Sequence, residues 1–317
     1  MADKIKVGIV GYGNLGKGVE QAIGRNPDFE LVTIFKKRSE TQLEEMREFI
    51  GKVDFMLLCI GSSVDLPIKA PEIARLFNTV DTFDAHTKIP EYFASVDAAA
   101  KQGDKLSMIA TGWDPGLFSA VRGLLDAILP GGKTNTFWGW GVSQGHGEAI
   151  KRVPGVIIAR AYTIPIESTL EEVRRGSRSD FSARQMHKRD CYVVVEEGAD
   201  TEAIRRQIVS IPYYFEFNDT TVTFVDMDTF QREHSELPHG GHVFRAGDTG
   251  AGANEQLAEF HIKLSSNPEF TASVMVSCCR AAWRMYNEGH RGAVSIFDAP
   301  IGYLSARDGY SLRKELL

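Results

Sequence analysis

Three glycines near the start of the chain have the spacing G-x-G-x-x-G. Gly11, Gly13 and Gly16 follow an apolar run at residues 5–10 and precede a helix-like stretch at residues 17–25. At this spacing the first glycine permits a tight turn, the second lets the backbone approach a pyrophosphate, and the third lets the helix pack on the strand. Helix N-termini favour such anions, because their N–H groups are unpaired. The residues predicted to contact a dinucleotide here are Gly11, Gly13, Asn14, Leu15 and Gly16.

Three consecutive cations follow the second predicted strand, residues 29–35. They are Lys36, Lys37 and Arg38. Units that bind NAD place an acid about 20 residues after the glycines, for the ribose 2′-hydroxyl, whereas NADP units accommodate a 2′-phosphate there with a cation. The run therefore favours NADP as the cofactor. The alternative is a solvated basic turn.

Two carboxylates, Asp84 and Asp114, follow the predicted strands at residues 79–83 and 105–110. Ligands of doubly wound sheets bind outside the carboxyl ends of the strands, so both acids are expected beside a nicotinamide. There they could hold a substrate ammonium or take protons during amine oxidation. For Asp114 the alternative is a helix N-cap, with Pro115 at the first helical position. Three further residues at strand ends are predicted to lie near the cofactor: Gly61, Ser62 and Asp81.

Strand-like and helix-like segments alternate through residues 5–110, which predicts an α/β, Rossmann-type, doubly wound parallel sheet. After the Pro-Gly-Gly at residues 130–132 the chain becomes rich in strands and aromatic residues, which indicates a second, α+β domain for substrate binding and dimerisation. A long helical run at residues 268–286 is expected to return to the first domain. We therefore expect a dinucleotide-binding domain at residues 1–117 with 268–317, and a substrate and dimerisation domain at residues 118–267.

Charge and hydropathy disfavour several functional classes. The net charge of −6, from 36 basic and 42 acidic residues, disfavours a nucleic-acid or anionic-membrane surface. No run approaches the roughly 18 apolar residues that span a bilayer, and the first residues lack the features of a signal peptide. We expect a cytoplasmic homodimer whose four cysteines are reduced.

Histidine and arginine residues mark the second domain. His239 and His242 stand in P-H-G-G-H, but no third ligand is evident, so no metal is expected. Arg189 precedes a predicted strand and could clamp a carboxylate bidentately. A structural ion pair is an equally good interpretation of Arg189.

Several segments together resemble the meso-diaminopimelate D-dehydrogenases of bacterial lysine biosynthesis. The resemblance rests on V-G-Y-G-N-L-G at residues 10–16, V-D-T-F-D at 80–84, G-W-D-P-G at 112–116, S-Q-G-H at 143–146 and L-P-H-G-G-H at 237–242. It extends through T-F-W-G at 136–139, H-K-R at 187–189 and N-P-E-F-T-A-S at 267–273, and so covers essentially the whole chain.

The resemblance implies a role for each matching residue. Asp84 and Asp114 would surround the D-configured amino centre, and Thr163, Arg189 and His239 would hold the distal carboxylate. The residues implied to line the ligand around them are Trp113, Trp138, Gln144, Gly145 and Asn267. Trp140 departs from the family pattern and could reshape the pocket.

The reaction implied is NADP-dependent oxidative deamination of the D-centre of meso-2,6-diaminopimelate, which gives L-2-amino-6-oxopimelate and ammonia. Two alternatives remain. One is another amino-acid or imine oxidoreductase, such as a saccharopine reductase-like enzyme, which also carries a G-x-D-P-G turn. The other is a dinucleotide-sensing regulator, which would need a partner surface or a DNA-reading element that the sequence does not show.

Overall fold

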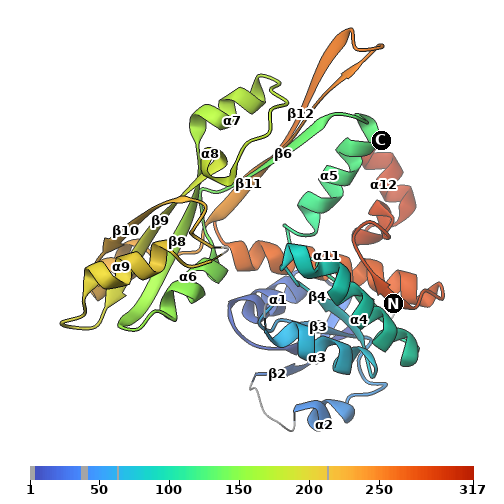
Figure 1. The fold of residues 1–317 in the computed structure, drawn as a ribbon. Coiled ribbons are helices and arrows are strands. Elements are labelled where there is room, and N and C mark those ends of the chain that lie inside the picture. Colours follow the sequence, from blue (N-terminus) through green and yellow to red (C-terminus); the bar gives the residue numbers. More distant parts are fainter. Residues whose placement is uncertain (1–3, 37–41, 63, 213) are drawn as a thin grey trace. The chain divides into compact units, whose positions relative to one another are not determined.

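The structure is a computed structural model that describes residues 4–36, 42–62, 64–212 and 214–317; the side chain of Gln144 lies outside this description. The chain divides into two compact units. Unit 1 comprises Met1–Ala120 and Pro268–Leu317, and unit 2 comprises Val121–Asn267. Unit 1 thus joins the blue and red ends of the chain in Figure 1. The first boundary between the two units was expected after residue 117 and lies after residue 120. The second boundary lies after residue 267.

Unit 1 is built on a six-stranded parallel sheet of order β13-β5-β4-β3-β1-β2. Its strands are β1 (Ile5–Val10), β2 (Phe29–Phe35), β3 (Phe55–Leu58), β4 (Asn78–Asp81), β5 (Leu106–Met108) and β13 (Gly292–Val294). Its helices are α1 (Asn14–Gly24), α2 (Gln42–Arg47), α3 (Asp65–Ala74), α4 (Ile89–Gln102) and α12 (Gly309–Leu316), with the short 3₁₀ turns η1 (His86–Lys88) and η2 (Ile301–Leu304). Helix α11 (Asn267–Asn287) begins at the last residue of unit 2 and continues through unit 1. The Rossmann-type doubly wound sheet is confirmed.

The central strands of this sheet are covered on both faces. Alternate residues of β3 enter different hydrophobic clusters: Phe55 and Leu57 pack with β1, α1 and α11, whereas Met56 and Leu58 pack with α3 and α4. A strand buried on both sides needs a continuous apolar sequence, and residues 55–60 are apolar throughout. The strand order reverses at β1, so the ligand crevice of the fold lies at the carboxyl end of β1.

Two helices begin at positions that local sequence signals do not mark. Helix α3 begins at Asp65 and contains Pro71 in its interior. Helix α5 (Leu117–Ile128) begins three residues after Asp114, so Asp114 is not its N-cap and Pro115 is not its first residue. The Asp114–Pro115 peptide bond is cis.

Unit 2 contains two sheets, as Figure 1 shows. The four-stranded sheet has the order β10-β9-β8-β7, with β7 (Gly141–Val142), β8 (Val156–Pro165), β9 (His187–Val195) and β10 (Asp219–Phe224). The three-stranded sheet has the order β12-β11-β6, with β6 (Lys133–Trp138), β11 (His239–Thr249) and β12 (Asn254–Leu264). Unit 2 contains α5 from Val121 onward. Its other helices are α6 (Gln144–Lys151), α7 (Glu167–Arg174), α8 (Ala183–Met186), α9 (Thr201–Val209) and α10 (Met227–Glu233). The expected α+β character is confirmed.

The long β11–β12 hairpin was not predicted from the sequence. Its two strands pair over their full eleven residues each, but most side chains of β12 are exposed. A strand with little buried surface carries only a weak apolar alternation, so the hydrophobic pattern did not mark it. Within the described residues, no helix is long and apolar enough to cross a membrane.

Candidate active site

The three glycines of the first turn serve different purposes. Gly11 has φ +93°, and a Cβ there would lie 2.5 Å from the carbonyl oxygen of Cys59. A Cβ on Gly16 would collide with the carbonyl oxygen of Gly11. A Cβ on Gly13, in contrast, would meet no atom within 4 Å. Gly11 and Gly16 are therefore required by the protein's own packing, whereas Gly13 keeps open the space in front of the turn.

The N-terminus of α1 is suited to an anion. Gly13 is its N-cap, no side chain caps the helix, and its first turn contains no acidic residue. The first helical bond is donated by the N–H of Lys17 to the carbonyl of Gly13 at 3.0 Å. The preceding N–H groups, on Asn14, Leu15 and Gly16, are those that a helix leaves for a ligand. This turn thus fits a pyrophosphate.

Lys36 lies beside the same turn. Its Nζ is 4.5 Å from the centroid of the Tyr12 ring, a cation–π contact that holds this cation at the end of β2 next to the glycines. The other two cations expected to read the ribose, Lys37 and Arg38, lie outside the described residues.

Ser62 and Asp84 are joined at the carboxyl edge of the sheet. The Ser62 hydroxyl donates to Oδ1 of Asp84 at 2.5 Å, and the Asp84 N–H donates to the Ser62 oxygen at 2.9 Å. The neighbouring Gly61 N–H donates to Asp65 at 3.1 Å. Asp84 is exposed. The carboxylate is thereby presented to solvent with one oxygen already oriented by a serine.

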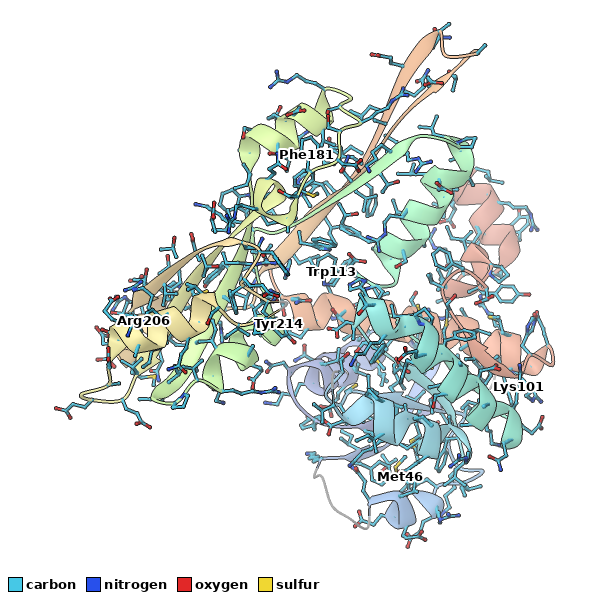
Figure 2. The ribbon with its side chains drawn as sticks, in the orientation of Figure 1. Met46, Lys101, Trp113, Phe181, Arg206 and Tyr214 are labelled. Atoms are coloured by element: carbon cyan, nitrogen blue, oxygen red, sulfur yellow. The ribbon has the colours of Figure 1, made fainter. Side chains whose placement is uncertain are left out.

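Asp114 stands in a compact loop that follows β5. The loop is closed by hydrogen bonds from Leu117 N–H to the Gly112 carbonyl at 3.0 Å and from Phe118 N–H to the Trp113 carbonyl at 2.7 Å. Trp113, labelled in Figure 2, is 6% exposed and packs edge-on against Phe118 with ring centroids 5.2 Å apart. Asp114 itself is partly buried. The adjacent strands β4 and β5 thus each deliver one carboxylate to the same edge of the sheet.

Asp81 was expected to contact the cofactor, but its carboxylate is fully buried and accepts hydrogen bonds from groups of unit 1. A cofactor cannot reach a side chain that is 0% exposed. Asp81 is the last residue of β4, whose four residues are all buried, and its side chain lies in the core of unit 1. The Asp81 side chain therefore has a structural position.

In unit 2, Thr163 and Arg189 are register partners on β8 and β9. The Arg189 guanidinium donates a hydrogen bond to the Thr163 hydroxyl, and its buried Nε has no partner. Burial lowers the pKa of Arg189 to about 10. Among the described residues no carboxylate lies within ion-pairing distance of Arg189. Its spare donors and uncompensated charge suit an incoming carboxylate.

His239 joins this cluster through the backbone. Gly141, the register partner of Thr163 on β7, lies directly against His239: a Cβ on Gly141 would lie 2.5 Å from the imidazole ring. His239 is 8% exposed and its Nδ1 accepts the N–H of Gly240 at 2.8 Å. The Asn267 N–H donates to the Leu237 carbonyl at 2.8 Å, which places Asn267 beside the start of the same strand. The fold of unit 2 thus brings together residues that are far apart in sequence.

Two further histidines belong to this region and were not predicted as site residues. Burial, together with the charge of Arg189, lowers the pKa of both His146 and His187 to about 3. The Nε2 of His187 accepts the Trp138 N–H at 2.9 Å, and the two rings are 5.5 Å apart. His187 is two residues before Arg189 in β9 and therefore shares its face, which is the signal that could have found it.

The remaining predicted residues of unit 2 differ in exposure. Trp138 is half-buried at the end of β6, Thr163 is buried, and Gly145 is exposed in the first turn of α6. Of Gln144 only the backbone is described, as the first residue of α6. Trp140 is 63% exposed.

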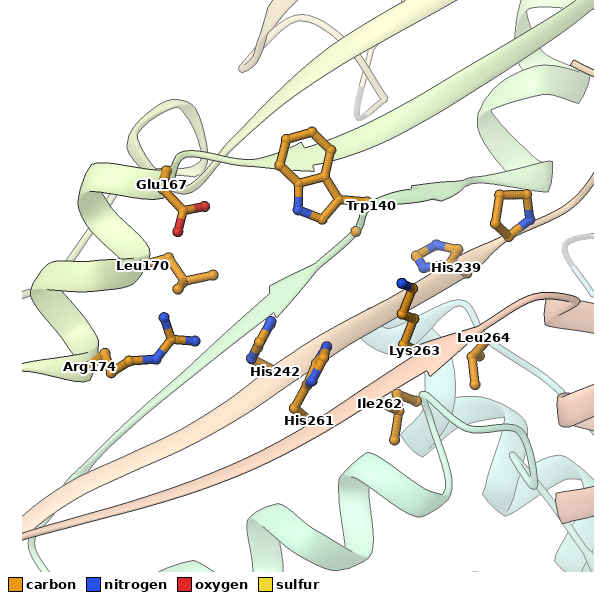
Figure 3. A pocket seen from close by; sticks show the side chains of 12 residues that line it. Trp140, Glu167, Leu170, Arg174, His239, His242, His261, Ile262, Lys263 and Leu264 are labelled. Atoms are coloured by element: carbon orange, nitrogen blue, oxygen red, sulfur yellow. The ribbon is translucent and has the colours of Figure 1, made fainter. Parts of the chain in front are cut away.

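A cavity of about 480 Å³ lies on unit 2 beside the β11–β12 hairpin. Trp140 and His239 are among the residues that line it, and Figure 3 shows His242 and His261 side by side. The rings of His242 and His261 stack at 4.0 Å, and His242 Nδ1 is 2.7 Å from Glu259. His242 is therefore engaged with Glu259 and His261 rather than with His239.

The Rossmann-type sheet with its glycine turn, followed by a second α+β unit, is typical of a two-domain, dinucleotide-dependent dehydrogenase. A family model, the diaminopimelic acid dehydrogenase C-terminal domain, matches residues 112–266. The meso-diaminopimelate D-dehydrogenase of Lysinibacillus sphaericus is 48% identical, with 99% of each chain covered, and that of Acetivibrio thermocellus is 49% identical, with 99% of this chain and 98% of the relative covered. The chain belongs to the meso-diaminopimelate D-dehydrogenase family.

Three solved structures are similar to this chain in fold and in sequence. A variant of the enzyme from Clostridium tetani with DAP is 46% identical and superposes with a TM-score of 0.93, covering 99% of this chain and all of the other. The C. glutamicum DAP dehydrogenase in complex with DAP is 40% identical, with a TM-score of 0.94 and 99% of each chain covered. An engineered D-amino acid dehydrogenase bound to NADP⁺ is 39% identical, with a TM-score of 0.90, 99% of this chain and all of the other covered.

Proposed function

We propose that this chain catalyses the reversible, NADP-dependent oxidative deamination of the D-centre of meso-2,6-diaminopimelate. The D-centre Cα loses a hydride, the resulting imine is hydrolysed by water, and L-2-amino-6-oxopimelate and ammonium leave, with one proton released. The observation that carries the proposal is the buried Arg189, whose charge no acid of the described residues neutralises, in a chain 48% identical to a meso-diaminopimelate D-dehydrogenase.

NADP is the cofactor, and unit 1 fits it. The open space at Gly13 and the uncapped α1 N-terminus suit the pyrophosphate, and Lys36 with Lys37 and Arg38 suits the 2′-phosphate. When bound, the nicotinamide ring accepts the hydride from the substrate. The role of this chain is to orient the substrate carbon and to exclude competing reactions.

Asp84 and Asp114 are assigned to the reacting amino group. A carboxylate that is hydrogen-bonded by Ser62 keeps one oxygen for an ammonium, as Asp84 does. Two acids on neighbouring strands can bind the ammonium jointly and can accept the proton that the amine must lose before hydride transfer. Trp113, nearly buried beside Asp114, supplies an apolar wall.

Thr163, Arg189 and His239 are assigned to the distal carboxylate. The two ends of diaminopimelate are chemically alike, so the enzyme must anchor one end to expose the other. A guanidinium with free donors next to a hydroxyl recognises a carboxylate in a fixed orientation. The residues that we assign to the walls around the substrate are Trp138, Gln144, Gly145 and Asn267.

We further propose a cytoplasmic homodimer. The exposed face of β12 and the exposed apolar side chains Leu124 and Ile128 on α5 are surfaces that a second copy could cover. The four cysteines are free and buried, which suits a reducing compartment. Light scattering of the purified protein tests the dimer.

Initial rates test the reaction. NADPH formation is measured with meso-, LL- and DD-diaminopimelate, each with NADP and with NAD. Turnover of the meso isomer with NADP, with little from the LL isomer, is expected. Turnover of saccharopine instead, or of no amino acid, would contradict the proposal.

A further inference from the structure

Asp81 is the most enclosed of the described acids of unit 1 and has no role in the reaction proposed above. It is the last residue of β4, its side chain is 0% exposed, and no cation among the described residues lies within ion-pairing distance of it. Its carboxylate is held instead by three neutral donors. Burial raises its pKa to about 6. Burying an ionisable group without a charged partner lowers the stability of the fold.

One set of contacts leads to Asp84. Oδ1 of Asp81 accepts the N–H of Phe83 at 2.9 Å, which closes the turn directly before Asp84. Oδ2 accepts the hydroxyl of Tyr92, on α4, at 2.7 Å. The Tyr92 ring stacks on Phe83 with centroids 4.0 Å apart and planes at 19°. Phe83 is thus fixed both at its backbone and at its ring, one residue before the exposed acid.

A second set of contacts leads to Asp114. The same Oδ1 accepts the N–H of Ala110 at 3.3 Å, at a residue with φ +57°. The Asp81 carbonyl accepts both the N–H of Thr111, at 2.9 Å, and its hydroxyl, at 2.8 Å. These bonds hold the start of the loop that contains Asp114. One residue therefore ties together the two loops that carry the proposed amine-binding acids.

We propose that Asp81 and Tyr92 are positioning residues that set the relative placement of Asp84 and Asp114. The inference rests on the proposed function, in which those two acids hold the reacting amine. A displacement of about 1 Å at a reacting centre can lower a rate by up to 100-fold. The expected signature is therefore a loss of kcat without a loss of cofactor affinity, since the glycine turn at Gly11–Gly16 shares none of these hydrogen bonds.

Three variants of the full-length enzyme separate shape from hydrogen bonding. Asp81→Leu keeps the branched shape of the side chain and removes both of its acceptor oxygens, and we expect kcat to fall by about 30- to 100-fold. Asp81→Asn keeps an oxygen for the Phe83 and Ala110 N–H groups and can donate to Tyr92, so it should recover most of that loss. Tyr92→Phe keeps the ring stack and removes one bond, and should lower kcat about five-fold. The KM for NADP should change less than two-fold in all three.

Asp97 provides a matched control. Its carboxylate also fixes a backbone segment of unit 1, by accepting the Ala293 N–H of β13 at 2.9 Å, but it touches neither acid-bearing loop. Asp97→Leu should lower the melting temperature and leave kcat within two-fold of the wild type. Melting temperatures are recorded for every variant, and rates are measured where each is folded.

The outcomes are distinct. Unchanged kcat in folded Asp81→Leu, or in Tyr92→Phe should Asp81→Leu not fold, would overturn the positioning role. So would a rise in the KM for NADP that matches the loss of kcat, or an equal loss in Asp97→Leu. A wild-type enzyme that forms no NADPH from meso-diaminopimelate would instead overturn the proposed function.

Discussion

The Arg189 guanidinium donates a hydrogen bond to the hydroxyl of its register partner Thr163, across strands β8 and β9. A threonine hydroxyl does not neutralise a guanidinium, and the buried Nε remains without a partner. A buried cation in this state is suited to an anionic ligand. In the proposed reaction Thr163 and Arg189 would hold the distal carboxylate of the substrate, and Asp84 and Asp114 would hold its reacting amino group.

Replacing Arg189 by methionine removes the charge and keeps much of the length. We expect the KM for meso-diaminopimelate to rise about 10- to 100-fold, because a charge-assisted hydrogen bond contributes about 1.5–3 kcal/mol, while the KM for NADP stays unchanged. Steady-state kinetics with each substrate varied in turn measure both. Arg160→Met is the control, since Arg160 also has a buried unpaired Nε on β8 but packs over Phe230 at 5.4 Å. Equal effects in the two variants would indicate a structural role for Arg189.

Alanine substitutions at Gly13 and Gly16 should affect different properties, cofactor binding in the first case and stability in the second. Gly13→Ala meets no neighbouring atom, so the melting temperature should stay close to that of the wild type while the Kd for NADP rises at least about ten-fold, because the methyl group occupies pyrophosphate space. Gly16→Ala collides with the Gly11 carbonyl and should destabilise the fold itself. Thermal melts and fluorescence titration with NADPH distinguish the two. Unaltered NADPH binding in Gly13→Ala would exclude this turn as the pyrophosphate site.

Neutralising the basic run should change cofactor choice. Lys37 and Arg38 lie outside the described residues, so this prediction rests on their position after β2. The Lys37→Ser/Arg38→Ser double variant should raise the KM for NADP at least about ten-fold and move the preference toward NAD, because the 2′-phosphate loses its counter-charges. Lys52→Ser, which removes a cation over Phe49, serves as the control. A retained NADP preference in the double variant would refute the assignment.

His187 should make the protein sensitive to acid. Its pKa is about 3 in the folded protein and 6.5 ordinarily, so the unfolded chain binds the proton more readily and folding stability falls as the pH drops below 6.5. The loss reaches about 2 kcal/mol at pH 5. His187→Gln can still accept the Trp138 N–H and does not titrate. The difference in unfolding free energy between pH 8 and pH 5 should therefore shrink by about 2 kcal/mol; urea melts at the two pH values measure it. An undiminished difference would show that His187 does not cause the sensitivity.

The sequence alone determined the dinucleotide unit and much of the chemistry. The glycine motif can be recognised because Gly11 and Gly16 are required by the packing of the turn itself. Strand β3 can be recognised because a strand buried on both faces must be apolar throughout. The motifs around Asp84, Asp114, Arg189 and His239 indicated the family, which the comparisons with relatives confirm. These features depend on residues that are close together in the sequence, so the sequence alone is enough to predict them.

The tertiary structure alone decided which polar residues point inward. Asp81 and Asp84 are three positions apart at the same strand end, yet one is fully buried and the other exposed. The convergence of Thr163, Arg189 and His239 depends on pairing between strands distant in sequence, as does the β11–β12 hairpin. The local sequence does not show which side chains are buried or how the strands pair, because burial and strand register are set by partners that are far away along the chain.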